Sequence, residues 1–169
     1  IDYDNGQFWG HMVGGQKKFW GTFMWKAGGF KDCIYHGEFE KGKPEGIGIM
    51  KYNNGRVYEG QFKASAPEGK GTEYYANGDK YVGEFSKGFK AGNGIYYYKN
   101  GDVYKGQFSA NKPNGKGKLT MVKGAVYEGQ FVNGKCQGQG EYRYENGDVY
   151  AGDWSNSIKH GEGTYKYAN

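Results

Sequence analysis

The chain has 169 residues, a net charge of +5, 33 glycines and only three prolines. Abundant glycine without a Gly-X-Y period excludes collagen, and scarce proline argues against a disordered low-complexity chain. Lysine and arginine are spread along the chain rather than clustered, so we expect no nucleic-acid partner, and no apolar run is long enough to form a membrane-spanning helix.

Residues 1–34 are predicted to be a degenerate copy of a repeat that caps the array. Phe8-x-Gly10-x-Met12 stands where regular copies have Tyr-x-Gly-x-Phe, and Phe19 replaces the first glycine of a Gly-x-Gly pair. Terminal repeats that cap an array are usually atypical in sequence. The same sequence features would result if these residues were a former regular repeat that has lost its motif. The chain starts without methionine and stops within a repeat, so we expect it to be a piece of a longer array.

A regular repeat of 23 residues fills the chain from residue 35 to residue 169. The motif Tyr-x-Gly-x-Phe, with Trp for Phe in the last copy, starts at residues 35, 58, 81, 104, 127 and 150. Each copy continues with Gly-x-Gly, an aromatic residue and, in most copies, Asn-Gly. Side chains of a strand alternate between its two faces, so this pattern predicts two short strands per copy, joined as a β-hairpin. A fixed period of this size indicates a repeat array.

The length of the Asn-Gly loop predicts which residues share a face of the sheet. A three-residue loop over residues 99–101, with Gly101 in the left-handed conformation, puts Tyr98 and Tyr104 on the same face. A two-residue loop would put these tyrosines on opposite faces. We choose the three-residue loop because it collects every repeating residue on one side.

The other connection, residues 86–91, has an even number of residues and keeps Phe85 and Gly92 on this same face. Phe85 is then expected beside Gly92 and, beyond it, Phe108, with glycine beside glycine and tyrosine beside tyrosine in the neighbouring rows. We therefore predict an all-β fold: a single-layer antiparallel sheet of stacked 23-residue β-hairpins that forms an elongated twisted rod. At about 4.8 Å per strand, seven copies would span on the order of 65 Å.

These rows predict a trough with a glycine floor and aromatic rails, which we interpret as a groove for a partner protein. The aromatic groove residues are Tyr58, Phe62, Tyr75, Tyr81, Phe85, Tyr96, Tyr98, Tyr104, Phe108, Tyr127, Phe131, Tyr144, Tyr150 and Trp154. The floor glycines are Gly60, Gly71, Gly83, Gly94, Gly106, Gly117, Gly129, Gly140 and Gly152. Two alternatives stay open: the trough accepts an extended peptide or a helix, or its rings pack on their own glycines and close it.

The chemistry of an enzyme is not visible in the chain. The three histidines are scattered, and the Gly-x-Gly pairs lie within predicted strands rather than before a helix, where a phosphate loop would be. Cys33 and Cys136 occupy unrelated positions, which fits a reducing compartment and predicts no metal site. We expect no catalytic activity and no cofactor.

Binding to anionic phospholipid is the alternative hypothesis. The connections between the two strands of each hairpin are expected along one edge of the sheet, and a row of lysines there can attract an anionic membrane. The residues concerned are Lys41, Lys43, Lys87, Lys90, Lys112, Lys135 and Lys159. Ordinary solvation of a sheet edge would produce the same row. Open terminal strands also make a homo-oligomer an alternative.

The unit Tyr-Glu-Gly-Gln-Phe…Gly-Lys-Gly…Tyr…Asn-Gly, as in residues 58–78, resembles the MORN repeat (membrane occupation and recognition nexus). The resemblance covers six copies over residues 35–169, the last truncated, and residues 1–34 loosely. It implies an elongated, non-catalytic β scaffold that binds partner proteins and other scaffold subunits in cytoskeletal or ciliary assemblies such as radial spokes. The implied location is the cytoplasm, at the cytoskeleton or in a cilium, and membrane binding is implied by the family's name.

Overall fold

The computed structural model of the protein describes residues 2–11 and 18–169. These residues form β-strands and one short 3-10 helix, which confirms the predicted all-β class. The elements are β1 (Asp2–Tyr3), β2 (Gly6–His11), β3 (Lys18–Trp25), η1 (Gly28–Phe30), β4 (Ile34–Glu40), β5 (Lys43–Lys51), β6 (Val57–Lys63), β7 (Ala66–Tyr74), β8 (Lys80–Ser86), β9 (Phe89–Tyr97), β10 (Val103–Ser109), β11 (Lys112–Thr120), β12 (Val126–Val132), β13 (Lys135–Arg143), β14 (Val149–Ser155) and β15 (Ile158–Lys166).

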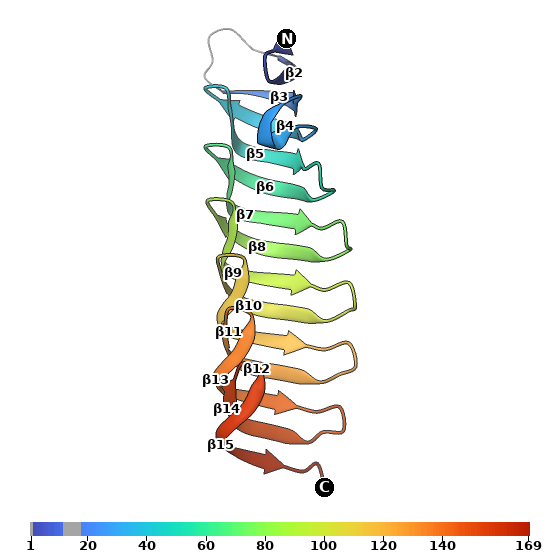
Figure 1. Cartoon of the computed structure of the whole chain (residues 1–169), viewed down its shortest axis with the longest axis vertical. Coiled ribbons are helices and arrows are strands. Elements are labelled where there is room, and N and C mark those ends of the chain that lie inside the picture. Colours follow the sequence, from blue (N-terminus) through green and yellow to red (C-terminus); the bar gives the residue numbers. More distant parts are fainter. Residues whose placement is uncertain (1, 12–17) are drawn as a thin grey trace. The chain divides into compact units, whose positions relative to one another are not determined.

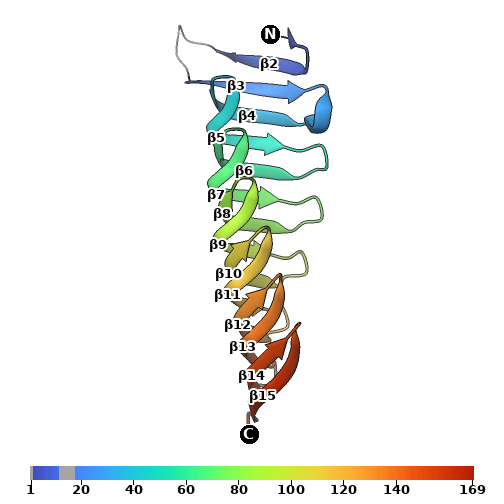
Figure 2. The same cartoon turned by 60° about the vertical axis from the view of Figure 1, so that its left-hand side comes forward.

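The chain divides into two compact units, Ile1–Gly88 and Phe89–Asn169, which we call unit 1 and unit 2. Within each unit the strands pair antiparallel in chain order, so each is a meander of successive hairpins (Figures 1 and 2). Two kinds of turn alternate at the two ends of the strands (Figure 1). They decide which side chains share a face.

The loop between β9 and β10 has the predicted length of three residues. The Tyr98 N–H donates to the Asp102 carbonyl at 2.9 Å, the Gly101 N–H donates to the Tyr98 carbonyl at 3.0 Å, and Gly101 has φ +95°. Tyr96 consequently lies directly opposite Tyr104. The prediction that the repeating tyrosines share one face is therefore confirmed.

The turn at the other end of the hairpin is shorter than predicted. In the β10–β11 hairpin, Ser109 lies opposite Lys112, and only Ala110 and Asn111 lie between them, with φ +47° and +71°. Positive φ at both residues is typical of a two-residue type I′ turn, whose twist matches that of the flanking strands. The strands thus continue through residues that we had predicted to be loop.

The longer strands change one of the predicted rows. Gly92 lies opposite Phe108 across β9 and β10, as predicted. Within the β10–β11 hairpin, however, Phe108 lies opposite Pro113 and not opposite Gly115. The predicted pairing of Phe85 with Gly92 assumed that the motif phenylalanine lies opposite the first glycine of the Gly-x-Gly pair in its own copy. Phe108 and Gly115 are the corresponding residues of the next copy and do not lie opposite each other, so this assumption is wrong. The reason is a β-bulge between Gly106 and Phe108 that absorbs the extra residues.

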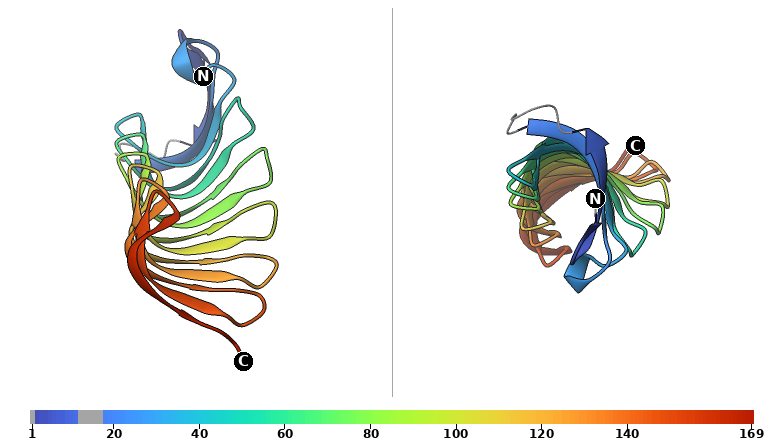
Figure 3. Two further views of the ribbon diagram at one scale, coloured as in Figure 1. Left: turned by 60° about the horizontal axis from the view of Figure 1, so that its bottom comes forward. Right: turned by 90° about the horizontal axis from the view of Figure 1, so that it is seen from above.

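The bulge recurs in the five regular hairpins that lie within one unit, and it depends on a glycine. In the β6–β7 hairpin the bulge glycine is Gly69, with φ +70°, and a Cβ there would lie 2.1 Å from the Gln61 side-chain oxygen. That oxygen accepts a hydrogen bond from the Lys70 N–H at 2.8 Å, which satisfies a backbone donor freed by the bulge. Bulges bend the strand that carries them, and the strands are strongly bent along their length (Figure 3).

Aromatic rings packed on glycine form the core. The Tyr58 ring covers Gly71 so closely that a Cβ there would lie 2.4 Å from the tyrosine oxygen. The Tyr58 hydroxyl donates to the Gln61 carbonyl at 2.8 Å. The ring also makes edge-to-face contacts with Phe62 and Phe85, with centroids 5.0 and 4.8 Å away. Such pairs stabilise a thin sheet that has few aliphatic side chains to bury.

The same contacts repeat along each unit, and we call the set the aromatic ladder. Its hydroxyl-to-carbonyl hydrogen bonds measure 2.8–3.2 Å in all six regular copies. Its members are Tyr35, Phe39, Tyr58, Phe62, Tyr81 and Phe85 in unit 1, and Tyr104, Phe108, Tyr127, Phe131, Tyr150 and Trp154 in unit 2.

The first copy keeps the ladder in altered form. The Phe8 ring covers Gly10 and Gly21, at the place where later copies have a tyrosine ring, but without a hydroxyl it cannot donate to the backbone. Phe19 stands in place of the bulge glycine and stacks on Phe39, with centroids 5.3 Å apart and rings 5° from parallel. Met12, predicted to stand for the phenylalanine of the motif, lies outside the described residues.

Candidate binding surface

Most of the predicted groove residues belong to the aromatic ladder and are buried. Their side chains are between 0% and 8% exposed, so they hold neighbouring hairpins together and present almost no surface to a partner. For these rings the burial favours the closed alternative. They are Tyr58, Phe62, Tyr81, Phe85, Tyr104, Phe108, Tyr127, Phe131, Tyr150 and Trp154.

The predicted floor glycines lie where the rows require. Each lies opposite another glycine on a neighbouring strand, and tyrosine rings of the ladder cover this double row. The row is therefore the floor of the core beneath the rings rather than the floor of an open groove. The residues are Gly60, Gly71, Gly83, Gly94, Gly106, Gly117, Gly129, Gly140 and Gly152.

The other four predicted groove residues, Tyr75, Tyr96, Tyr98 and Tyr144, keep part of their surface accessible. Tyr75 lies in unit 1, and the rest lie in unit 2, where they contribute to a row of paired side chains near the three-residue loops. We call this row the tyrosine rail. It consists of Tyr96 with Tyr98, Leu119 with Met121, and Tyr142 with Tyr144.

Contacts within the rail keep its rings in place. The ring centroids of Tyr96 and Tyr98 are 4.6 Å apart, and so are those of Tyr142 and Tyr144. The Tyr142 hydroxyl donates to the Met121 sulfur at 3.5 Å, which links one pair to the next. Tyr98 is 36% exposed. A preordered aromatic surface of this kind loses little side-chain entropy when it binds.

The lysines predicted to face a membrane divide into two groups. Five lie exposed near the two-residue turns, Lys41, Lys43, Lys87, Lys112 and Lys135, and Lys159 is exposed as well. The second group stands over rings: Lys90 is 7% exposed, with Nζ 5.5 Å from the Tyr96 centroid, and Lys159 Nζ lies 4.7–5.2 Å from three tyrosine rings. Cations at this distance are attracted to the ring faces, so these two lysines are already partnered within the chain.

A buried ion pair replaces the usual tyrosine contacts in one hairpin of unit 1, and sequence reasoning missed it. The Arg56 guanidinium lies 2.8 Å from the Glu73 carboxylate and 3.8 Å from the centroid of the Tyr52 ring. Glu73 is 3% exposed and also accepts a hydrogen bond from the Tyr75 hydroxyl. The signal was present: Glu73 stands where other copies have Tyr96 or Tyr142, and Arg56 where they have aspartate.

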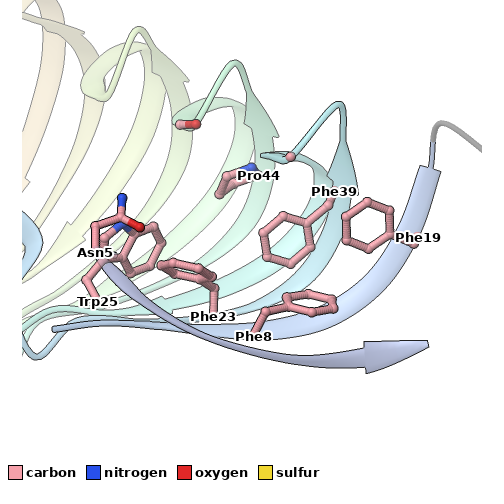
Figure 4. Close-up of a pocket in the computed structure, with 9 residues that line it drawn as sticks. Asn5, Phe8, Phe19, Phe23, Trp25, Phe39 and Pro44 are labelled. Atoms are coloured by element: carbon pink, nitrogen blue, oxygen red, sulfur yellow. The ribbon is translucent and has the colours of Figure 1, made fainter. Parts of the chain in front are cut away.

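An apolar pocket of about 290 Å³ lies in the first hairpins of unit 1, where we had predicted only a cap (Figure 4). Two ring clusters face each other across it: Phe8, Phe19 and Phe39 on one side, and Phe23 with Trp25 on the other. Asn5, Gly42, Pro44 and Ser65 complete the lining that the structure describes. None of these nine residues carries a charge.

Other kinds of site have little support in the described part of the chain. Residues 2–11 and 18–169 contain no group of three or more His, Cys, Asp or Glu side chains placed to hold a metal ion. The only described helix, η1, is far too short to cross a membrane. Nothing at the rail or at the pocket forms an acid–base pair.

Successive glycine–aromatic hairpins in an antiparallel meander define a β-hairpin repeat scaffold. The family model described as MORN repeat matches residues 35–55, 58–80, 81–103, 104–126, 127–149 and 150–169. The chain therefore belongs to the MORN-repeat family, as its sequence pattern indicated.

Two solved structures resemble the chain more distantly. The SAS-4 (dCPAP) TCP domain of Drosophila melanogaster, in complex with a proline-rich motif of Ana2 (dSTIL), matches with a TM-score of 0.47 and 18% identity over 73% of this chain and 68% of that one. The E1021V mutant of the TCP10 domain of Danio rerio CPAP matches with a TM-score of 0.37 and 12% identity over 80% and 77%. Comparison with individual curated proteins gave no significant match.

Proposed function

We propose that this protein is a non-enzymatic scaffold and that the tyrosine rail of unit 2 binds an extended segment of a partner protein. The observation that supports the proposal is the contrast on one face: the ladder rings are buried, whereas the rail rings beside them keep accessible surface. Tyrosine supplies a large contact area and a polar hydroxyl at low entropic cost, which suits it to a binding surface.

The spacing of the rail favours a polyproline II segment over an α-helix. One rail pair recurs per hairpin, and two strand spacings of about 4.8 Å amount to about 9.6 Å. A polyproline II helix has three residues per turn and rises about 3.1 Å per residue, so the same side of it recurs every ~9.3 Å. An α-helix repeats every ~5.4 Å along its axis and matches this spacing poorly. Aromatic grooves are a common receptor for such proline-rich segments.

Neighbouring tyrosines with opposite orientations provide a matched test. Tyr98 belongs to the rail and is 36% exposed, whereas Tyr97 is 39% exposed and alternates onto the other face of the sheet. We expect a proline dodecapeptide to bind the wild-type chain and Tyr98→Ala to weaken this binding about 5- to 30-fold, as truncation of an interface anchor does. Tyr97→Ala should bind as wild type. Equal binding of a Gly-Ser dodecapeptide, or equal losses in the two variants, would rule the proposal out.

The cytoplasmic setting, at the cytoskeleton or in a cilium such as at radial spokes, is part of the same proposal and is supported by the family membership alone. Anionic-lipid binding is kept as the alternative, supported by the five exposed lysines near the two-residue turns. Flotation with phosphoinositide vesicles at low and high salt tests it, because electrostatic membrane binding must weaken as salt rises.

A further inference from the structure

The apolar pocket of unit 1 exists because the first copy departs from the repeat. Phe19 replaces the bulge glycine and adds a ring to one wall. On the other wall, the Phe23 ring lies against Gly6, where a Cβ would be 2.5 Å from the ring. Every later copy has a larger residue at the position of Gly6, and in three copies it is an aspartate: Asp79, Asp102 and Asp148. The fold does not need these residues, since none of the six later copies has a counterpart of Phe19 or of Gly6.

Position 44 explains why the pocket stays open on its third side. Lys159 occupies the equivalent position in the last copy and extends over the rings of Tyr144, Tyr150 and Tyr165. Lys90 does the same over Tyr96. Pro44 has a short ring that does not extend across the sheet in this way. Pro44 therefore leaves the neighbouring ring surface uncovered. This surface includes Trp25, which occupies the position equivalent to Tyr144.

We propose that this pocket binds the side chain of a partner's tryptophan, as an anchor separate from the tyrosine rail. An apolar cavity of about 150 Å³ is enough for benzene, so about 290 Å³ accommodates the two fused rings of an indole. The five aromatic rings offer both faces and edges, and edge-to-face packing is favourable for a further ring. Asn5 provides an amide oxygen near Trp25 that can accept the indole N–H, which a buried tryptophan requires (Figure 4).

The lining argues against other ligands of similar size. Phosphate or an acidic side chain would find no cation among the nine lining residues that the structure describes. An ammonium group would find rings but no carboxylate to neutralise it, so attraction to the ring faces would be its only compensation for the cost of leaving water. An uncharged aromatic group meets neither penalty.

The test uses indole as the probe and two proline substitutions that later copies show to be compatible with the fold. Pro44→Lys copies the arrangement of Lys90 and Lys159 and should place a lysine across the pocket, next to Trp25. Pro113→Lys is the matched control, because it makes the same change in unit 2. By ligand-observed NMR we expect indole to bind the wild type and Pro113→Lys with millimolar affinity or better, and Pro44→Lys at least tenfold more weakly.

Intermolecular NOEs from indole to the Phe23 and Trp25 rings of the wild type provide a check that needs no variant. Absence of indole binding, NOEs to other rings only, or preference for tetramethylammonium over indole would overturn the assignment. Tyr98→Ala should bind indole as wild type does, so a failure of the rail and a failure of the pocket are separate results.

Discussion

Gly117→Ala is the substitution for which the structure predicts the clearest cost. A Cβ at this position would lie 2.3 Å from the Tyr104 oxygen and 2.6 Å from two of its ring carbons. The ring has no room to move away, because Tyr104 is 1% exposed and lies edge-to-face with Phe108 and Phe131 at 5.2 and 4.9 Å. Overpacking of this kind costs about 1–3 kcal/mol.

The displaced ring would also lose a hydrogen bond. The Tyr104 hydroxyl donates to the Gln107 carbonyl at 2.9 Å, and loss of such a bond costs about 1 kcal/mol. The two contributions add to about 2–4 kcal/mol of unfolding free energy, measured by urea denaturation. Gly29→Ala is the control: no atom lies within 4 Å of a Cβ there, so we expect a change within about 0.5 kcal/mol.

A double-mutant cycle with Tyr104→Ala tests the cause rather than the size of the effect. Once the ring is absent, the alanine methyl group at position 117 has space, so Gly117→Ala should cost much less in that background. If Gly117→Ala unfolds like the wild type, or if it costs the same with and without the Tyr104 ring, then the ring does not pack on this glycine and the description of the core is wrong.

Three further predictions concern the ladder and the buried ion pair. Tyr58→Phe keeps the ring but removes the hydroxyl that donates to the Gln61 carbonyl, and we expect a loss of about 1 kcal/mol in urea denaturation; no loss would contradict a role for this bond. Burial raises the pKa of Tyr104 to about 12, above the ordinary value of 10.0, so the folded state holds its proton more tightly than the unfolded state. The stabilisation that comes from the protonated Tyr104 hydroxyl is complete below pH 10 and is lost as the pH rises from 10 towards 12. A melting temperature that stays constant over this pH range would contradict the burial of Tyr104. Arg56→Ala removes the cation that lies beside the buried Glu73 carboxylate, and we expect a loss of about 3 kcal/mol, the low end for buried pairs because the Arg56 side chain is 33% exposed. Adding Glu73→Tyr, which restores the residue type of Tyr96 and Tyr142, should recover most of this loss, and an Arg56→Ala variant as stable as the wild type would show that the pair is not needed.

The hairpin repeat could be predicted because its signals are local. Asn100-Gly101 marks a turn, and the requirement that all repeating residues share a face selects a three-residue loop, which puts Tyr98 and Tyr104 on one face. The two-residue turn could not be recognised in the same way, because its residues differ from copy to copy: Ala110 and Asn111 adopt positive φ without a glycine, whereas Asn133 is followed by Gly134. Pro113 also gave a misleading signal, since proline is unusual within a strand.

The candidate site was harder to predict, because exposure depends on contacts between copies. Tyr104 is buried partly by Phe131, a ring 27 residues further along the chain, whereas Tyr98 keeps 36% of its surface exposed. The pocket results from positions at which the first copy differs from the later ones, such as Gly6, where three later copies have aspartate. A search for residues that repeat between copies overlooks such positions. Comparison of each copy with the others was the signal that could have found the pocket and the Arg56–Glu73 pair.

Nitration of tyrosines, located by mass spectrometry, tests most directly the claim that the ladder is structural and the rail is accessible. We predict early modification of Tyr98 (36% exposed) and of the reference residues Tyr97 (39%) and Tyr74 (42%). Tyr58 and Tyr104, at 0% and 1%, should remain unmodified until the chain unfolds. Nitration of Tyr58 and Tyr104 as fast as Tyr98 in the folded protein would contradict the account.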